Sequence, residues 1–164
     1  MTRFLCLSLC FAGVLFATGA AATQAEHVRA EGAWIRVLPG TLPAGGFVTL
    51  HNDGDQAATL RAVTSAAYAD IMLHQSSTAG GMSRMSTLEQ LDIPAHGTVA
   101  LAPAGYHLML MDANAPVQPG QTVKLTLRFA DGSTLATDFL ARPANALGPA
   151  EDAGHAMDHG HTGH

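Results

Sequence analysis

The sequence predicts an all-β protein, built as an antiparallel sandwich or barrel. Short runs of β-branched and apolar residues recur along the chain, and turn-forming residues separate them. Within residues 122–129, apolar and polar side chains alternate without interruption, which is typical of a half-buried strand. No segment shows a sustained helical period. With 164 residues, 48% of them hydrophobic, the chain is long enough for one domain with its own core.

The expected strands can be placed in order along the chain. Eight segments combine strand-forming residues with turn signals at their ends: residues 33–37, 46–51, 59–64, 70–75, 98–101, 106–111, 122–129 and 135–141. Asp131-Gly132 predicts a hairpin turn between the last two strands. One turn of helix is expected at residues 66–70. Seven or eight short strands at this spacing fit a sandwich or a barrel.

The N-terminal segment is expected to lie outside the folded domain. Arg3 gives a positive start, residues 4–16 form a short apolar run, and small residues follow. This pattern predicts a secretory signal peptide, assigned to residues 1–25, with cleavage after Ala22 or Ala25. The apolar run is too short to span a membrane, and no later segment approaches the necessary length.

Both cysteines of the chain, Cys6 and Cys10, fall inside this predicted signal peptide. The mature protein is therefore expected to have no disulfide, no redox thiol pair and no thiolate ligand. A lipoprotein attachment site at Cys10 is the alternative. It is the weaker interpretation, because Cys10 comes too early in the apolar run.

The composition changes at the C-terminal end of the expected domain, which spans residues 26–142. Pro, Ala, Gly, Asp and His dominate residues 143–164, which predicts a flexible, disordered tail. Five residues of metal-ligand type fall in its last ten positions: His155, Met157, His159, His161 and His164. Imidazole-rich tracts bind Cu(II), Ni(II) or Zn(II), and we expect Cu(II) here. A solvated low-complexity end is the alternative.

The charge pattern argues against nucleic acid and anionic membranes as partners. The formal net charge is −5 with neutral histidines, and the basic residues are scattered along the chain.

Four soft ligands are spread through the middle of the chain: His74, Met85, His107 and Met109. Alternate residues of a strand share a face, so His107 and Met109 are expected to point the same way. Neutral imidazoles and thioethers are the donors that Cu(I) prefers, and this set contains neither thiolate nor carboxylate. It suits Cu(I) better than Zn(II), Ca(II) or Mg(II). Taken singly, each of the four can equally be a structural residue, since Met often fills cores.

The segment from His74 to Met111 resembles the PCuAC family of periplasmic copper chaperones. That family's pattern is His, ten residues, Met, twenty-one residues and His-x-Met, and this sequence matches it without a gap. The surrounding residues are also similar: Ala33-Trp34-Ile35-Arg36, Gly80-Gly81, and Gly105 through Met111. The resemblance covers about residues 28–142. One departure is that Gln75 and Ser76 follow His74, where many relatives have a Met.

The resemblance implies a cupredoxin-like β-sandwich with Greek-key connections that binds Cu(I) at these four residues. It further implies delivery of copper in the periplasm to the binuclear copper site of cytochrome c oxidase, with an oxidase subunit or another oxidase-assembly copper protein as acceptor. Because this chain lacks that Met after His74, the sequence leaves open which residue supplies an additional sulfur near the site. Met82 or Met111 could provide it, although we expect Met111 to pack in the core.

Other functions can be weighed against copper delivery. A blue copper protein needs a Cys thiolate with two His, which the mature chain is expected to lack. An enzyme is not expected, because no nucleophile-base pair or paired-carboxylate arrangement is recognisable. Copper storage or detoxification in the periplasm uses the same ligands, and the sequence does not separate it from delivery.

Overall fold

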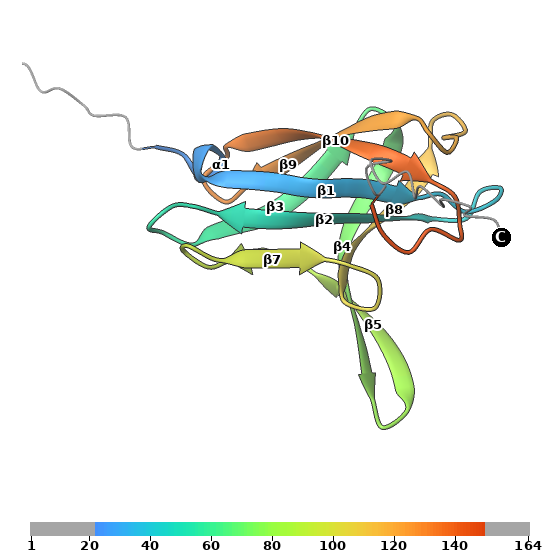
Figure 1. Ribbon diagram of the computed structural model, residues 1–164, viewed down its shortest axis with the longest axis horizontal. Coiled ribbons are helices and arrows are strands. Elements are labelled where there is room, and N and C mark those ends of the chain that lie inside the picture. The colour runs from blue at the N-terminus through green and yellow to red at the C-terminus, as the bar shows by residue number, and fades with distance from the viewer. Residues whose placement is uncertain (1–21, 150–164) are drawn as a thin grey trace, which may run out of the picture.

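The computed structural model describes residues 22–149, which form one short helix and ten strands (Figure 1). The elements are α1 (Gln24–His27), β1 (Val28–Arg36), β2 (Ala44–Asn52), β3 (Ala58–Ser65), β4 (Tyr68–Ala79), β5 (Met82–Leu88), β6 (Leu91–Ile93), β7 (Thr98–Leu101), β8 (Tyr106–Ala113), β9 (Thr122–Phe129) and β10 (Thr134–Arg142). All eight expected strands are present. The predicted signal peptide up to residue 21 and the tail from residue 150 lie outside the described residues.

The strands join in one hydrogen-bonded sheet with the order β5-β4-β8-β7-β2-β1-β10-β9-β3-β6. Most neighbours are antiparallel, but β1 runs parallel to β10, and β7 runs parallel to β8. The expectation of a purely antiparallel sheet is therefore wrong in detail. Alternation within a strand does not reveal the direction of its neighbour, so the sequence could not show these two pairings.

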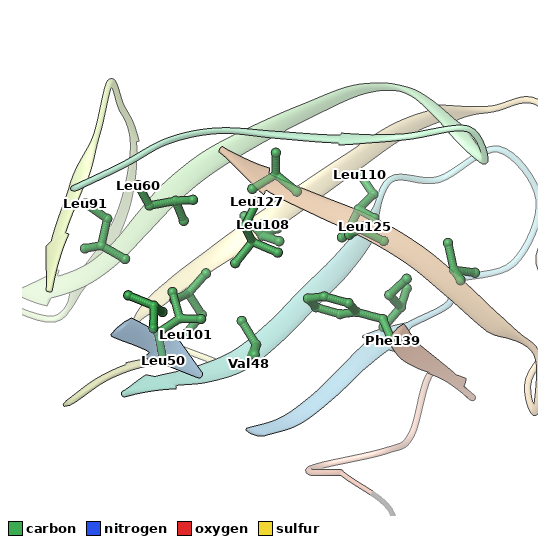
Figure 2. Close-up of a cluster of buried hydrophobic side chains, with 14 of the residues drawn as sticks. Val48, Leu50, Leu60, Leu91, Leu101, Leu108, Leu110, Leu125, Leu127 and Phe139 are labelled. Atoms are coloured by element: carbon green, nitrogen blue, oxygen red, sulfur yellow. The ribbon is translucent and has the colours of Figure 1, made fainter. Parts of the chain in front are cut away.

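The sheet curls around its main hydrophobic core. β3 and β4 contact each other although they are not neighbours in the hydrogen-bonded order. Side chains from β2 and β8 meet those from β3, β9 and β10 in the interior, and Figure 2 shows part of this cluster. Leu110, Leu125 and Phe139 are completely buried there. The expected sandwich is thus confirmed in part: one core lies between two halves of a continuous mixed sheet.

Some local features differ from expectation. No helical turn forms at residues 66–70; residues 66 and 67 are a bend, and β4 begins at Tyr68. The Ser65 hydroxyl accepts a hydrogen bond from the backbone N–H of Ala67 (3.1 Å), which stabilises the bend instead of a helix. β4 also continues to Ala79, beyond the expected end at residue 75, and the short edge strand β6 was not expected. Between β4 and β5, Gly80 and Gly81 form a hairpin, which is one of the two arrangements, hairpin or loop, that these glycines favour.

The residues before β1 pack on the domain. The backbone N–H of Gln24 donates to Asp131 (2.7 Å), that of Ala25 donates to Ser133 (3.0 Å), and Ala25 packs against the core. Cleavage after Ala22 would keep these contacts, whereas cleavage after Ala25 would remove them. Within residues 22–149 no helix has the length and apolar character needed to cross a membrane.

The segment 143–149, which the sequence assigns to the tail, lies against the outer face of β1 and β2. Ala146 is buried in a small cluster with Trp34 and Phe47, whose ring centroids are 4.5 Å apart. The Arg142 guanidinium donates to the carbonyl of Gly148 (2.8 Å), which holds this segment in place.

Candidate metal centre

Three neighbouring strands, β5, β4 and β8, bring the predicted ligands to one face of the sheet. His74 of β4 lies directly opposite His107 of β8, and Met72 lies opposite Met109. Residues directly opposite each other in an antiparallel pair point to the same side. The side chains of these four residues, and that of Met85 on β5, therefore lie on the outer face, which we call the ligand face.

The same strands face the core with their alternate residues. Leu73 lies opposite Leu108, and Leu108 and Leu110 are almost completely buried. A shift of one residue in this register would turn the ligands inward and the leucines outward. Core packing therefore fixes the side on which the ligands emerge.

His74 is at the centre of the cluster and is only 8% exposed. Its Nδ1 lies 3.1 Å from the sulfur of Met85, and its Nε2 lies 3.2 Å from the hydroxyl of Thr87. The His107 ring approaches edge-on, with the ring centroids 5.7 Å apart and an interplanar angle of 79°.

His107 is held by the loop that precedes it. Its Nδ1 lies 3.1 Å from the carbonyl oxygen of Gly105, which also accepts a hydrogen bond from the backbone N–H of Ser76 (3.0 Å). A carbonyl only accepts, so Nδ1 carries the proton and Nε2 keeps a free lone pair. His107 is buried, with 9% of its surface exposed.

Met85 reaches the site from an exposed hairpin. β4 and β5 are joined by Gly80 and Gly81, both with positive φ (59° and 78°). A two-residue loop of this kind matches the twist of the flanking strands. The hairpin projects from the body of the protein (Figure 1), and Met85 is 55% exposed although its sulfur touches His74.

Met109 is half-buried between two strands. It lies opposite Met72 of β4 on one side and opposite Gly45 of β2 on the other. Met109 therefore lies on the ligand face two residues beyond His107, with a second thioether, that of Met72, beside it.

The electrostatics of the site favour neutral imidazole. Burial, and secondly the charge of nearby His107, lower the pKa of His74 below its ordinary value of 6.5. Within residues 22–149, no group of three or more His, Cys, Asp and Glu side chains is placed to hold a metal ion. The arrangement thus offers neutral nitrogen and sulfur donors, which suit a soft monovalent cation rather than a hard divalent one.

The structure brings His74, Met85, His107 and Met109 to the same face. The five predicted tail ligands, from His155 to His164, lie outside the described residues. Of the two sulfurs considered as auxiliary, Met82 lies on the opposite face of β5 from Met85, and Met111 is half-buried on the ligand face rather than in the core.

Two further side chains, those of Met72 and Thr87, share the ligand face with His74 through strand alternation and pairing. Met72 stands two residues before His74, and strand alternation alone predicts that it shares the face of His74. Sequence reasoning missed Thr87, because its position depends on the register between β4 and β5.

The fold is that of the PCuAC domains. The apo PCuAC domain of PmoF2 matches with a TM-score of 0.63 and 22% identity, over 74% of this chain and 94% of that domain. The Cu(I) form of DR1885 from Deinococcus radiodurans matches with a TM-score of 0.57 and 34% identity, over 68% of this chain and 75% of that protein. These likenesses confirm the resemblance to PCuAC domains.

The chain belongs to the LpqE-like family, described as "Putative lipoprotein LpqE-like", which it matches over residues 28–140. A relative in Leifsonia xyli subsp. xyli, "Putative lipoprotein Lxx21020", is 38% identical over 112 residues, covering 68% of this chain and 67% of the relative. The lipoprotein description of the family agrees with a location outside the cytoplasm. The residues at which a lipid would attach, including Cys10, lie outside the described part of the chain.

Proposed function

We propose that this protein is a periplasmic copper carrier that binds one Cu(I) ion through His74, Met85, His107 and Met109. The observation that carries the proposal is the contact between His74 Nδ1 and the Met85 sulfur (3.1 Å), with the His107 ring edge beside it. Two different donor atoms, a nitrogen and a sulfur, are already in contact beside a second buried imidazole.

The spacing of the donor atoms fits a shared ion. With metal–nitrogen and metal–sulfur bonds of about 2.0 and 2.3 Å, a tetrahedral ion places its nitrogen and sulfur about 3.5 Å apart. The observed separation of 3.1 Å is shorter by a few tenths of an ångström. Because Met85 is on an exposed hairpin, a small outward movement of its side chain can admit the ion.

The unequal burial of the ligands favours transfer over permanent retention. The two imidazoles are buried, whereas Met85 is 55% exposed. An incoming ligand of an acceptor can replace the exposed thioether first, while the imidazoles still hold the ion. We propose a copper protein of oxidase assembly as the acceptor, with the binuclear copper site of cytochrome c oxidase as the destination. In this role the protein is a carrier and not an enzyme.

Anaerobic titration with Cu(I) against a coloured chelator tests the site. We expect Met85→Leu and His107→Ala to weaken Cu(I) binding by at least tenfold. Met82→Leu is the matched control, because Met82 is also an exposed thioether of β5 (60%) but points away from the ligand face. Equal losses for Met85→Leu and Met82→Leu would refute the assignment, as would copper X-ray absorption without mixed nitrogen and sulfur neighbours.

Storage is the competing role, and a transfer experiment separates it from delivery. Cu(I)-loaded protein is mixed with the apo copper domain of an oxidase subunit, and the copper in each is measured after separation. We expect transfer within minutes. Retention of copper by the loaded protein, despite a tighter-binding acceptor, would favour storage.

We propose that the tail residues His155, Met157, His159, His161 and His164 form a separate site for Cu(II). Several imidazoles within ten positions of one low-complexity segment can together supply the tetragonal nitrogen coordination that Cu(II) prefers. In electron paramagnetic resonance, a chain ending at Pro149 should lose most of the nitrogen-coordinated Cu(II) signal and still bind Cu(I). A signal that survives this truncation and disappears in the His74→Ala, His107→Ala double variant would place Cu(II) in the core site instead.

A further inference from the structure

Thr87 of β5 is a neighbour of the candidate copper site with no assigned role. It lies directly opposite His74 in the β4–β5 ladder, and its hydroxyl oxygen is 3.2 Å from His74 Nε2. The two ring nitrogens of His74 therefore face two different side chains of the same strand. Nδ1 faces the sulfur of Met85, and Nε2 faces the hydroxyl of Thr87.

Only one protonation form of His74 can bind copper beside Met85. A neutral imidazole carries its proton on one nitrogen and offers a lone pair on the other. Because the Met85 sulfur lies next to Nδ1, a shared ion must be bound by Nδ1. The proton must then be on Nε2, where it needs an acceptor, and the Thr87 oxygen is within hydrogen-bond distance.

The opposite protonation form would block the site. If the Thr87 hydroxyl donated to Nε2, the ring proton would have to be on Nδ1, directly between the ring and the Met85 sulfur. Copper binding by Nδ1 is therefore linked to the hydrogen bond that Thr87 accepts, because both require the ring proton of His74 to be on Nε2.

The two histidines of the site differ in which ring nitrogen faces a possible copper ion. His107 donates from Nδ1 to the Gly105 carbonyl and has Nε2 free, whereas His74 has Nδ1 facing its sulfur neighbour. A carbonyl fixes the first ring, and a hydroxyl, which can either donate or accept, faces the second. The Thr87 hydroxyl can therefore fit either protonation form of His74, whereas the Gly105 carbonyl fits only one form of His107.

We propose that Thr87 is a positioning residue that accepts a hydrogen bond from the Nε2–H of His74 and thereby leaves Nδ1 free to bind Cu(I), so that the two histidines bind copper through different nitrogens. This inference rests on the proposed copper function and adds the residue that orients one ligand. Thr87 itself does not touch the ion.

A pair of substitutions in the full-length chain tests the proposal. Thr87→Val keeps the shape and the β-strand preference but removes the hydroxyl, whereas Thr87→Ser keeps the hydroxyl. Loss of a hydrogen-bond partner of a metal-ligating histidine commonly costs 10- to 100-fold in metal affinity. We expect Cu(I) affinity to fall by about tenfold in Thr87→Val and to change by less than about threefold in Thr87→Ser.

The nitrogen that binds copper can be observed directly. Long-range proton–nitrogen NMR spectra of the ¹⁵N-labelled, Cu(I)-loaded protein distinguish a protonated ring nitrogen from a metal-bound one. We expect His74 to be protonated at Nε2 and copper-bound at Nδ1, and His107 to show the reverse. In Thr87→Val, the Nε2 proton of His74 should exchange faster with water.

The outcomes separate this inference from the proposed function. If the unmodified protein binds Cu(I) but Thr87→Val binds it equally well, or if His74 binds through Nε2, the role of Thr87 is overturned and the copper site stands. If the unmodified protein does not bind Cu(I) at all, the proposed function is overturned and this inference with it.

Discussion

At the scale of single residues, the candidate site combines buried imidazoles with more accessible thioethers. His74 and His107 are almost fully buried, while Met72 and Met85 are 38% and 55% exposed. Burial disfavours protonation of an imidazole, and a thioether does not titrate. Burial thus lowers the pKa of His74 and favours its neutral, metal-binding form, and the methionines remain accessible to an incoming ligand.

The lowered pKa of His74 predicts acid sensitivity of the copper-free protein. Its folded-state pKa lies below the ordinary 6.5, so the unfolded chain binds this proton more readily than the folded one. The free energy of unfolding should be at its full value above about pH 6.5 and fall as the pH drops through the folded-state pKa. Thermal melts of the apo protein from pH 8 to 5 measure this. His74→Gln should flatten the dependence, and an unchanged slope would contradict the assignment to His74.

Copper binding should weaken over the same pH range. Protons compete with Cu(I) for the imidazole nitrogens, whereas the two thioethers are unaffected. We expect Cu(I) affinity to decrease from pH 8 to pH 5 without being abolished, as measured by chelator competition. An affinity that stays constant over this range would argue against both histidines as ligands.

Met72 provides a test of how many thioethers bind the ion. It lies opposite Met109 on the ligand face but is not one of the four proposed ligands. We expect Met72→Leu to change Cu(I) affinity by less than about threefold, whereas Met109→Leu should weaken it by at least tenfold, since loss of about 1.4 kcal/mol is tenfold. If both variants lose the same affinity, Met72 is a ligand as well.

At the scale of elements, the β4–β5 hairpin and β8 supply the ligands of the site and differ in how firmly they are held. β8 has His107 and Met109 on the ligand face and the buried Leu108 and Leu110 on the core face, so its position is fixed by packing. β5 is an edge strand whose residues are exposed up to Thr87. Core packing thus holds the two ligands of β8 in place, whereas the position of Met85 on β5 depends on the geometry of the hairpin turn.

Strain in the hairpin turn should reduce copper affinity. Gly80 and Gly81 have positive φ, where an L side chain costs about 1–2 kcal/mol, although nothing lies close enough to clash with a Cβ. We expect Gly81→Ala to weaken Cu(I) binding roughly five- to tenfold by loosening the hairpin that carries Met85.

Gly132 supplies the control for this prediction. It also has positive φ (85°) and open surroundings, but it lies in the β9–β10 turn, away from the ligand face. Gly132→Ala should lower the unfolding temperature without changing Cu(I) affinity. A loss of affinity equal to that of Gly81→Ala would show that general destabilisation, and not the hairpin, is responsible.

At the scale of the whole molecule, one curled sheet places its core on one side and the ligand face on the other. The ligand face continues from β8 across β2 to β1, where Trp34 and Phe47 are covered by Ala146. The segment after β10 therefore belongs to the folded unit as far as the structure describes it. The boundary between domain and tail lies later than composition alone would place it.

Two truncations test this boundary. A chain ending at Pro149 should keep its stability, because Ala146 still packs on Trp34. A chain ending at Arg142 should lose about 1–3 kcal/mol, from the exposed rings and the lost Arg142–Gly148 hydrogen bond. Urea denaturation measures the difference, and the fluorescence of Trp34 should shift to the red only in the shorter chain. Identical curves for the two chains would show that segment 143–149 contributes nothing.

Much of the fold follows from local sequence patterns. Residues 98–101 and 122–129 were expected as strands with the bounds that β7 and β9 have, because alternation and turn residues are local signals. The expected helical turn at residues 66–70 is wrong: residues 66 and 67 form a bend, with the Ser65 hydroxyl accepting a hydrogen bond from Ala67, and composition does not reveal such a contact. The parallel pairing of β1 with β10 joins segments about a hundred residues apart, and no local pattern encodes it.

The sequence by itself determined the chemistry of the candidate site, because the residue types fix a neutral set of nitrogen and sulfur donors. Only the tertiary structure decided their arrangement. It set His74 opposite His107, brought Met85 back over His74 through the β4–β5 hairpin, and placed Thr87 at the other ring nitrogen. These relations depend on strand register, and register is set by burial of Leu73, Leu108 and Leu110 in a core to which the whole chain contributes.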